Sequence, residues 1–293
     1  MNISELEKKA KMVRRHILAM GYRAKSAHSG GAYSCVEILV SLYFDIMKVH
    51  VKNHLDPRRD RLVFSKAHDA KALYAVLAER GYFSPKILEK YEVDNAVLPG
   101  HSTRHCVPGV EVSAGSLGHG LPMACGMAFG LKLNHESGIM NNGKTKKQNH
   151  NSQFIIHNSR PHVYAVLSDG ECDEGSTWEA ALFAGHHHLD NLTVIVDYNK
   201  LQGFGFTKNV LTLEPFADKW KAFGFAVREI HGHSFRELKH ALSSAPFVKG
   251  KPSVIIAHTI KGFGGPKYLE NTIASQYKSP TEEDYKNLVT GNS

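Results

Sequence analysis

An acid and an amide follow two expected strands at the points where those strands end. The apolar run at residues 163–168 is followed by Asp169-Gly170, and the run at 192–197 ends just before Asn199. Open α/β sheets hold their ligands outside the carboxyl ends of their strands. Magnesium prefers oxygen ligands and takes one or two from carboxylates, with phosphate oxygens completing its shell. The pattern therefore predicts a site for a divalent metal ion together with a diphosphate.

The backbone beside these side chains offers further contacts to a diphosphate. Gly170 leaves room for the backbone to approach a phosphate, and the turn into the helix at 175–178 exposes N–H groups and the positive end of a helix dipole. The carbonyl oxygen of Leu201 is a third candidate metal ligand. An isolated Asp-Gly pair would indicate an ordinary capped turn, but Asp169 and Asn199 stand thirty positions apart with one helix and one strand between them. This spacing favours a ligand site.

The elements that must position these residues alternate between strand and helix. Short apolar strands rich in β-branched residues are expected at 61–65, 163–168, 192–197, 225–231 and 252–259. Apolar residues at helical spacing predict helices at 4–27, 35–49, 67–82, 121–133, 177–188, 214–224, 234–245 and 280–289. Apolar strands that alternate with helices are typical of a mostly parallel sheet with helices on both faces, so the expected fold class is α/β.

Helix ends and loops complete this expectation. Ser34 is expected to cap the second helix, and the helix that starts at Ser65 is expected to close at Gly81. Residues 94–114 carry Gly, Pro and His without periodicity, which indicates a loop over a site. The Asn- and Lys-rich stretch at 138–162 indicates a surface insertion, flexible or disordered, with a partner contact as the alternative.

Length and composition fit one folded domain spanning residues 1–293. No apolar run approaches the roughly 18 residues that a membrane span needs, and the N-terminal segment lacks the apolar core of a signal peptide. The net charge of +8 comes from scattered basic residues without a nucleic-acid-binding signature, which argues against nucleic acid, and a basic balance fits small anionic substrates equally well. The four cysteines form no CxxC pair, which argues against a zinc ribbon or a disulfide framework and makes a cytoplasmic location the expectation.

Further short motifs occur in order along nearly the whole chain. They are His28-Ser29-Gly30-Gly31, Ser65-Lys66-Ala67-His68, Gly100-His101-Ser102, Gly115-Ser116-Leu117-Gly118-His119-Gly120 and Lys261-Gly262-Phe263-Gly264. Together with the Asp-Gly and Asn pair, they resemble the motifs of the transketolase family, in its N-terminal, thiamine diphosphate-binding part. The resemblance implies the thiamine diphosphate-binding fold and an enzyme that passes a two-carbon ketol unit from a ketose to an aldose.

The resemblance also implies a role for each matching residue. The metal ion, magnesium or else calcium or manganese, would have as ligands Asp169, Asn199 and the carbonyl of Leu201. Thiamine diphosphate would be contacted by His68, Gly115, Leu117, Asp169, Gly170, Glu174, Asn199 and Lys261. The catalytic residues would be His28, His68 and His101. Imidazole suits this role because it donates, accepts and titrates near neutral pH.

Within these sets, Gly115 and Leu117 would line the aminopyrimidine ring, and Glu174 would join a carboxylate network at a subunit interface. His119 lies in the Gly-rich loop, where a secondary role is open, and the role of His105 is open as well. The run at 186–188 contains three histidines at a helix end, where they complement the helix dipole. Adjacent residues on a helix point in different directions, which argues against a metal site there.

One departure from the family motifs concerns the segment after Lys261. Family members that are split into two chains often carry a Trp-His pair there, whereas this chain has Ser275-Gln276. A histidine that contacts substrate or phosphate is therefore expected to be missing.

The resemblance finally implies a partner. Transketolases continue into a second domain that binds the aminopyrimidine and supplies a glutamate to it, and no residue of this chain matches that glutamate. We therefore expect a separate C-terminal subunit, a heterotetramer of two and two chains, and a phosphorylated or unusual sugar as substrate. Two alternatives stay open. One is the α-subunit of a 2-oxoacid dehydrogenase, which also carries a Gly-Asp-Gly and Asn motif. The other is a non-catalytic scaffold subunit, which is considered because Gln276 stands where a histidine is expected.

Overall fold

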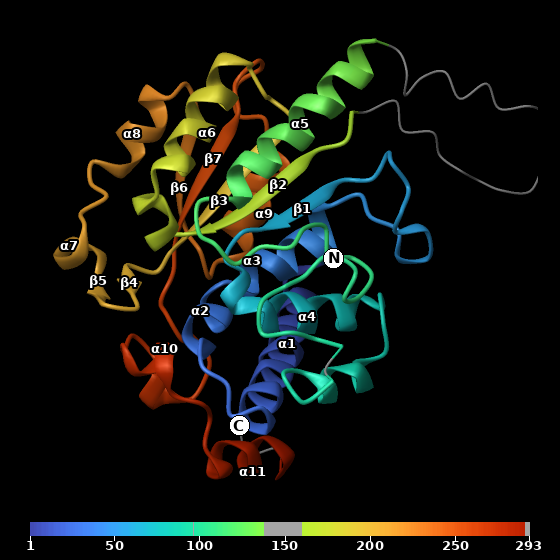
Figure 1. The fold of residues 1–293 in the computed structure, drawn as a ribbon, viewed down its shortest axis with the longest axis vertical. Coiled ribbons are helices and arrows are strands. Elements are labelled where there is room, and N and C mark those ends of the chain that lie inside the picture. Colours follow the sequence, from blue (N-terminus) through green and yellow to red (C-terminus); the bar gives the residue numbers. More distant parts are fainter. Residues whose placement is uncertain (96, 138–159, 291–293) are drawn as a thin grey trace, which may run out of the picture.

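A five-stranded parallel sheet forms the centre of the molecule in the computed structural model, which describes residues 1–95, 97–137 and 160–290 (Figure 1). The strands run in the order β1-β2-β3-β7-β6, and every neighbouring pair is parallel. Their bounds are β1 Arg61–Phe64, β2 Val163–Ser168, β3 Leu192–Tyr198, β6 Ala226–His231 and β7 Ser253–His258. The predicted mostly parallel α/β sheet is confirmed.

Helices cover both faces of this sheet, as predicted. The main helices are α1 Ile3–Arg23, α3 Val36–Ser41, α4 Ala70–Arg80, α5 Gly120–Glu136, α6 Gly175–His186, α8 Phe216–Ala222, α9 Phe235–Ser243 and α11 Glu282–Thr290. Shorter pieces are α2 Ser29–Ser34, α7 Thr207–Val210, α10 Ala274–Tyr277 and the small hairpin of β4 Leu201–Gln202 and β5 Gly205–Phe206. This hairpin, α7 and α10 were not predicted.

Alternation along the strands divides the core into two apolar clusters, one on each face. In β3, Ile195 packs into the cluster under α1, α3, α4 and α9, whereas Val194 and Val196 pack into the cluster under α5, α6 and α8. Because β2 and β3 are buried along their whole length, neither strand can carry a polar face. The polar residues of these strands are therefore confined to their ends.

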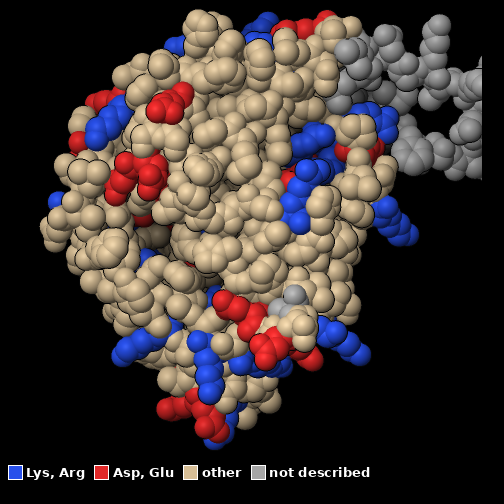
Figure 2. Space-filling model, in the orientation of Figure 1, with Lys and Arg blue, Asp and Glu red and all other residues tan. Residues whose placement is uncertain are grey.

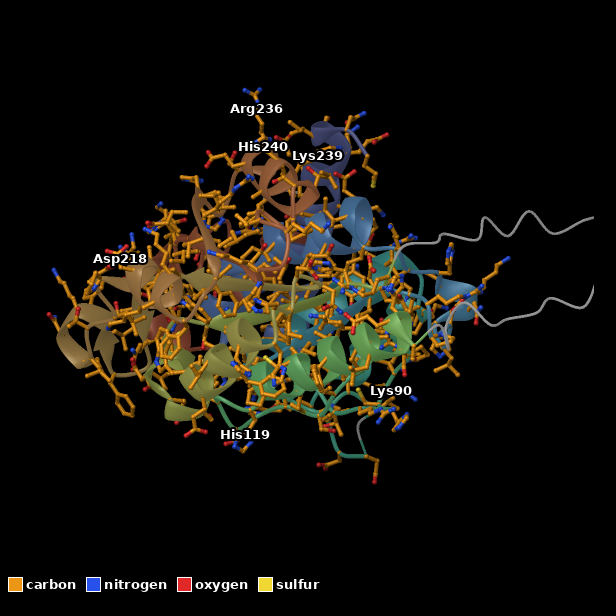
Figure 3. All side chains as sticks on the ribbon, turned by 90° about the horizontal axis from the view of Figure 1, so that it is seen from above. Lys90, His119, Asp218, Arg236, Lys239 and His240 are labelled. Carbon is orange, nitrogen blue, oxygen red and sulfur yellow. The ribbon has the colours of Figure 1, made fainter. Side chains whose placement is uncertain are left out.

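The helices show the amphipathic character that this packing requires. In α9, Phe235 and Leu238 point into the core, while Arg236, Lys239 and His240 point outward (Figure 3). On the face shown in Figure 2, acidic and basic side chains are interspersed around a broad uncharged area. Within the described part of the chain, every helix is too short or too polar to cross a membrane.

One helix prediction was wrong in detail. Ser34 does not cap a long second helix but is the last residue of α2, and Cys35, with a φ of −97° and a ψ of 9°, separates α2 from α3. The interruption lets the Ser34 hydroxyl donate to the carboxylate of Asp197 at 2.5 Å, with the carbonyl oxygen of Gly31 2.9 Å away as a second possible acceptor. A contact between distant parts of the chain has thus replaced the local cap.

Other boundaries agree more closely. Gly81, with a φ of 94°, closes α4 as predicted, although α4 begins at Ala70 after a 3₁₀ turn at Ala67–Asp69 rather than directly after Ser65. The described residues of 94–114 form no helix or strand, which agrees with the predicted loop. Most of the predicted insertion at 138–162 lies outside the described residues.

Candidate functional site

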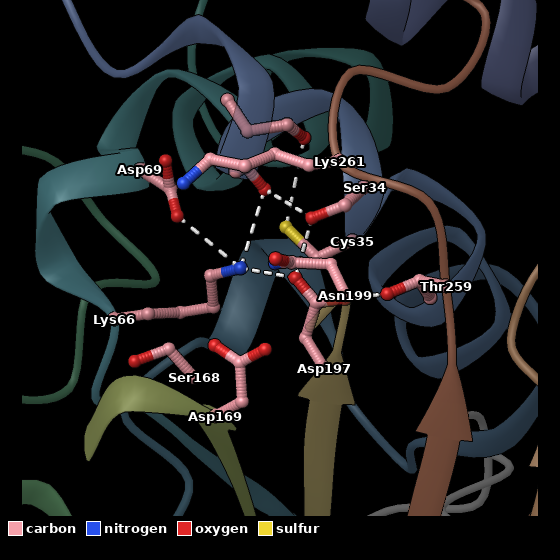
Figure 4. Close-up of polar contacts among 12 residues, drawn as sticks. Ser34, Cys35, Lys66, Asp69, Ser168, Asp169, Asp197, Asn199, Thr259 and Lys261 are labelled. Carbon is pink, nitrogen blue, oxygen red and sulfur yellow. Dashed lines mark hydrogen bonds and ion pairs between the residues drawn. The ribbon is translucent and has the colours of Figure 1, made fainter. Parts of the chain in front are cut away.

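The carboxyl ends of β2 and β3 lie side by side at one edge of the sheet. Ser168 at the end of β2 lies opposite Asp197 of β3 in the parallel ladder. Asp169 and Asn199, which follow the two strands, are therefore neighbours, and Figure 4 shows their side chains together with that of Asp197. The expected juxtaposition of acid and amide is present.

Asp169 is a buried carboxylate whose hydrogen-bond donors, among the described residues, are backbone groups. Its Oδ1 accepts the N–H of Gly170 at 2.8 Å, and its Oδ2 accepts the N–H of Lys200 at 2.6 Å. Burial, reinforced by the nearby charge of Asp197, raises the pKa of Asp169 to about 6. A carboxylate whose ionised form is disfavoured in this way would be stabilised by a bound cation, so the residue fits a divalent metal ion.

The other two expected metal ligands lie on the turn that follows β3. Oδ1 of Asn199 accepts the N–H of Leu201 at 3.1 Å, and the carbonyl oxygen of Leu201 accepts a hydrogen bond from Nζ of Lys261 at 2.8 Å. An ammonium group thus already occupies one lone pair of the carbonyl predicted to bind a metal. A metal ion would have to bind the other lone pair of this oxygen.

Lys261 connects this turn to the segment that departs from the family motifs. Its Nζ also donates to Oε1 of Gln276 at 2.8 Å, and burial lowers the pKa of Lys261. The carbonyl of Gln276 accepts the N–H of His28 at 2.9 Å, and a Cβ added to Gly30 would overlap Oγ of Ser275. Ser275 and Gln276 therefore fasten α10 to the loop that carries the first predicted histidine.

The three histidines expected to be catalytic lie close together. The ring centroid of His28 lies 5.6 Å from that of His68 and 6.3 Å from that of His101. His28 has a φ of 59°, a left-handed conformation that is uncommon outside glycine and that turns its side chain at the start of α2. Burial lowers the pKa of His28, although the charge of Asp69 opposes this effect, so the neutral ring is favoured.

A buried ion pair supports the strand ends, and sequence reasoning missed it. Lys66 pairs with Asp197, and Asp197 also accepts hydrogen bonds from Ser34 and Thr259 (Figure 4). Lys66 additionally lies 3.2 Å from the carboxylate of Asp69. The sequence offered only a weak signal for this cluster. The motif that contains Lys66 was interpreted through its histidine, and an aspartate at the end of a strand, such as Asp197, does not by itself indicate an ion pair.

The Gly-rich loop rests on a second missed acid, Glu171. Oε1 of Glu171 accepts the N–H of Gly118 at 2.9 Å and the hydroxyl hydrogen of Ser65, and burial raises the pKa of the Glu171 carboxyl. Gly118 has a φ of 83°, and a Cβ there would lie 2.7 Å from Cβ of Glu174. The loop, the end of β2 and the second histidine motif are thus joined through one buried carboxylate.

The remaining predicted cofactor contacts lie around this loop. Gly115 is next to His101, whose Cδ2 would lie 3.6 Å from a Cβ added at Gly115. Leu117 is half-buried, and Glu174 is exposed at the start of α6. An exposed glutamate beside a buried site agrees with the expected place at a subunit interface, and its role there stays a prediction.

The histidines that were not predicted to be catalytic lie outside the cluster of His28, His68 and His101. His119 is exposed at the start of α5 and points outward (Figure 3), and His105 is exposed in the loop before it. The ring of His187 packs against Phe129 and Phe183, with centroid distances of 4.7 and 4.3 Å. Packing accounts for His187 without a ligand.

Comparison with known proteins identifies relatives over the full length of the chain. A family model described as the transketolase, thiamine diphosphate binding domain matches residues 7–287. The chain is 38% identical over 285 residues to the 6-deoxy-6-sulfo-D-fructose transketolase subunit SqwG of Clostridium sp., with 97% of this chain and 95% of that protein covered. It is 40% identical over 285 residues to an apulose-4-phosphate transketolase subunit from Actinobacillus succinogenes, with 97% and 94% covered.

Solved structures give the same result for the fold. The transketolase of Leishmania mexicana superposes with a TM-score of 0.83 at 30% identity, covering 98% of this chain and 41% of that one. The transketolase of Campylobacter jejuni superposes with a TM-score of 0.84 at 29% identity, covering 99% and 43%. The chain therefore spans about two fifths of these transketolases but nearly the whole of the relatives that are named as subunits.

Proposed function

The chain belongs to the transketolase family as an N-terminal, thiamine diphosphate-binding subunit of a transketolase-type transferase, and from this premise we propose that it transfers a two-carbon ketol unit from a ketose to an aldose together with a separate C-terminal subunit. The proposal treats residues 1–293 as one diphosphate-binding domain. It also includes a cytoplasmic location and an assembly of two and two chains.

The observation that carries the proposal is the meeting of two sets of residues at one sheet edge. Asp169, Asn199 and the Leu201 carbonyl form one set, and the three histidines form the other. Lys66 connects the two sets because its ammonium pairs with Asp197 at the strand ends and lies 3.2 Å from Asp69, which in turn contacts His68. A metal–diphosphate site beside a histidine cluster is what a sugar-transferring thiamine enzyme requires.

The residues present fit a magnesium ion and thiamine diphosphate. Asp169 is a buried carboxylate with a raised pKa, and the Leu201 carbonyl offers a neutral oxygen, one lone pair of which accepts from Lys261. In the proposal these two residues and Asn199 hold the metal ion, while Gly170, His68 and Lys261 contact the diphosphate and Gly115 and Leu117 contact the aminopyrimidine. Thiamine diphosphate, when bound, supplies the carbon nucleophile and the electron sink for breaking and forming the carbon–carbon bond.

The chain's own contribution is to bind the sugar and to handle its protons. His28 is mainly neutral near pH 7 because burial lowers its pKa, so its ring can accept a proton from a sugar hydroxyl. His68 and His101 lie within one ring-to-ring contact of His28 and can orient neighbouring hydroxyl or carbonyl groups. The proposed substrate is a ketose with an anionic group, since the relatives are named for a phosphate and for a sulfonated sugar.

The partner belongs on the face formed by α5 and α6. Leu133 of α5 is 47% exposed, and Leu182 and Phe183 of α6 are 60% and 37% exposed. Figure 2 shows that the surface over α5 is largely free of charged side chains. The exposed Glu174 lies at the start of α6, so this face adjoins the candidate site. A face with exposed leucines and few charges next to an incomplete site suits a chain that completes it.

The test is reconstitution with a C-terminal transketolase-like chain from the same genome. The chain alone should bind thiamine diphosphate and magnesium weakly and should not turn over a ketose phosphate, and the mixture should do both. Turnover by the chain alone would contradict the partner requirement. Decarboxylation of a 2-oxoacid by the mixture would favour the dehydrogenase alternative, and an absence of cofactor binding in the mixture would favour the scaffold.

A further inference from the structure

Asp69 is a fully buried carboxylate at the start of α4. It stands at the N-cap, where an aspartate ordinarily accepts a hydrogen bond from the first turn of the helix. Its side chain makes no such bond. The carboxylate is therefore turned away from the helix that it could cap, and its role must come from the groups that it faces.

Those groups are a lysine and a predicted catalytic histidine. Oδ2 of Asp69 lies 3.2 Å from Nζ of Lys66 and 3.2 Å from Nε2 of His68. Among the described residues, neither oxygen of Asp69 has a hydrogen-bond partner of normal geometry. Since Lys66 also pairs with Asp197, two carboxylates share one ammonium group. The Asp69 carboxylate, which shares the Lys66 ammonium with Asp197, lies directly beside His68.

The neighbouring backbone makes room for this carboxylate. A Cβ added to Gly31 would overlap both carboxylate oxygens of Asp69. The carbonyl of Gly31 accepts a hydrogen bond from Nζ of Lys66 at 3.2 Å. Gly31 belongs to α2, which starts beside His28, so α2 and the 3₁₀ turn before α4 close around the Asp69 side chain.

The surroundings keep this carboxyl group ionised. Burial alone would raise the pKa of Asp69, but the charges of His68 and Lys66, with a smaller contribution from Lys261, hold it well below its usual value. Asp69 in turn raises the pKa of the half-buried His28 against the effect of burial. The carboxylate thus acts on two of the three clustered histidines.

We propose that Asp69 is a positioning residue whose carboxylate accepts a hydrogen bond from Nε2–H of His68 and so fixes the His68 tautomer with Nδ1 as its acceptor nitrogen. A base that is oriented by a third group is a general arrangement in enzymes that move protons. The inference rests on the proposed function for what His68 serves, whereas the Asp69–His68 contact stands without it.

The test is the tautomer of His68, read from ring-nitrogen chemical shifts of the full chain labelled with ¹⁵N-histidine. The variant H68Q assigns the signals. At about pH 8, where a free imidazole is neutral, the wild type should show the Nε2–H tautomer alone. The isosteric variant D69N should show a mixture with the Nδ1–H tautomer. Unchanged His68 signals in D69N, or a mixture in the wild type, would overturn the proposal.

Two further variants keep the test decisive if D69N folds poorly. Gly31→Ala retains the Asp69 charge but displaces the carboxylate, so it should change the His68 signals in the same direction. Asp60→Asn is the matched control, because Asp60 is also a buried aspartate but accepts its hydrogen bonds from the N–H groups of Lys48 and His162. D60N should leave the His68 signals unchanged.

Activity separates this inference from the proposed function. In the reconstituted enzyme, D69N should lower kcat/KM by about 10- to 100-fold because His68 is misoriented, with the loss mainly in kcat. If the wild-type mixture transfers no ketol unit, the proposed function fails while the tautomer result stands. If the mixture is active and D69N keeps full activity despite an altered tautomer, the positioning role is wrong.

Discussion

Two neighbouring carboxylates at the strand ends differ in what the protein supplies to them. Asp197 pairs with Lys66 and accepts hydroxyl hydrogens from Ser34 and Thr259. Within the part of the chain that the structure describes, Asp169 accepts hydrogen bonds from two backbone N–H groups alone, and its pKa is raised to about 6. A carboxylate whose oxygens already accept an ammonium and two hydroxyl groups has little acceptor capacity for a ligand. Asp169 retains such capacity, and a bound cation would stabilise its ionised form. The two residues should therefore respond differently to the same substitution.

Asp169→Asn should lower the affinity of the reconstituted protein for magnesium and thiamine diphosphate at least about 100-fold, because a charged ligand is lost. The stability of the lone chain should stay within about 1 kcal/mol or rise, because an unfavourable buried charge is removed. Asp197→Asn should instead destabilise the chain by about 3 kcal/mol or more, because Lys66 loses its main partner. Titration calorimetry and urea unfolding separate the two effects. Normal cofactor binding by D169N would exclude Asp169 as a metal ligand.

Lys71 gives the chain a distinct pH dependence of stability. Its Nζ donates to Oγ of Ser26 at 3.0 Å and to the carbonyl of Ala27, and burial lowers its pKa from 10.5 to about 8. Between these values the unfolded chain binds more protons than the folded chain, so stability rises with pH. From pH 8 to 10 the gain should be about 2 kcal/mol. Urea unfolding at several pH values should show this rise in the wild type, and Lys71→Met should remove it; an equal rise in both would contradict the assignment.

The sequence predicted the site residues that belong to short motifs but not those whose role depends on partners brought together by the fold. Asp169, Asn199 and the three histidines could be predicted because strand ends and short motifs mark them. Lys66, Asp197 and Asp69 could not, because nothing local shows that Lys66 and Asp69, which lie on one turn, will meet a carboxylate at the end of a distant strand. Buried charges of this kind become visible only when the partners are brought together.

At the level of elements, close approach between backbones decides which glycines are essential. Gly185 lies in α6 against the turn that precedes β6, and a Cβ there would overlap the carbonyl oxygen of Phe223. Gly126 lies in α5 with open space around its missing Cβ. Both glycines are helical, so their intrinsic helix propensity is the same, and only the packing differs.

Gly185→Ala should destabilise the chain by more than about 2 kcal/mol, because the backbone of Phe223 cannot move aside without displacing α8 and β6. Gly126→Ala should stabilise it by about 0.5–1 kcal/mol, because alanine is the better helix former. Thermal or urea unfolding of the two variants measures both changes. Equal effects of the two substitutions would show that α6 does not depend on this close contact.

The order and type of the elements followed from periodicity, but some boundaries did not. The alternation of apolar strands and helices predicted the parallel sheet because buried strands leave a plain signal. The predicted helix at 35–49 was too long, since Cys35 leaves the helical conformation and residues 42–46 form a wider turn. The hairpin of β4 and β5 is only two residues on each side, too short for any periodic pattern.

Across the whole molecule, the candidate site lies at one edge of the sheet, and the face of α5 and α6 that carries the exposed leucines adjoins it. Leu182 is 60% exposed, and Glu179 stands three positions earlier, on the same side of α6. In the proposed assembly this face contacts the C-terminal subunit. Leu182 is a suitable probe because its side chain contributes little to the core of the isolated chain.

Leu182→Glu should weaken association with the C-terminal subunit by at least about tenfold, because a charge would be placed where apolar surface is to be buried. It should change the stability of the lone chain by no more than about 0.5 kcal/mol. Val289→Glu is the matched control: Val289 is 68% exposed on α11, at the other end of the molecule (Figure 1). Light scattering on mixtures of the two chains should detect the loss of assembly in L182E and normal assembly in V289E. The reverse pattern would place the partner on the opposite side of the sheet, where it could not complete the site at Asp169.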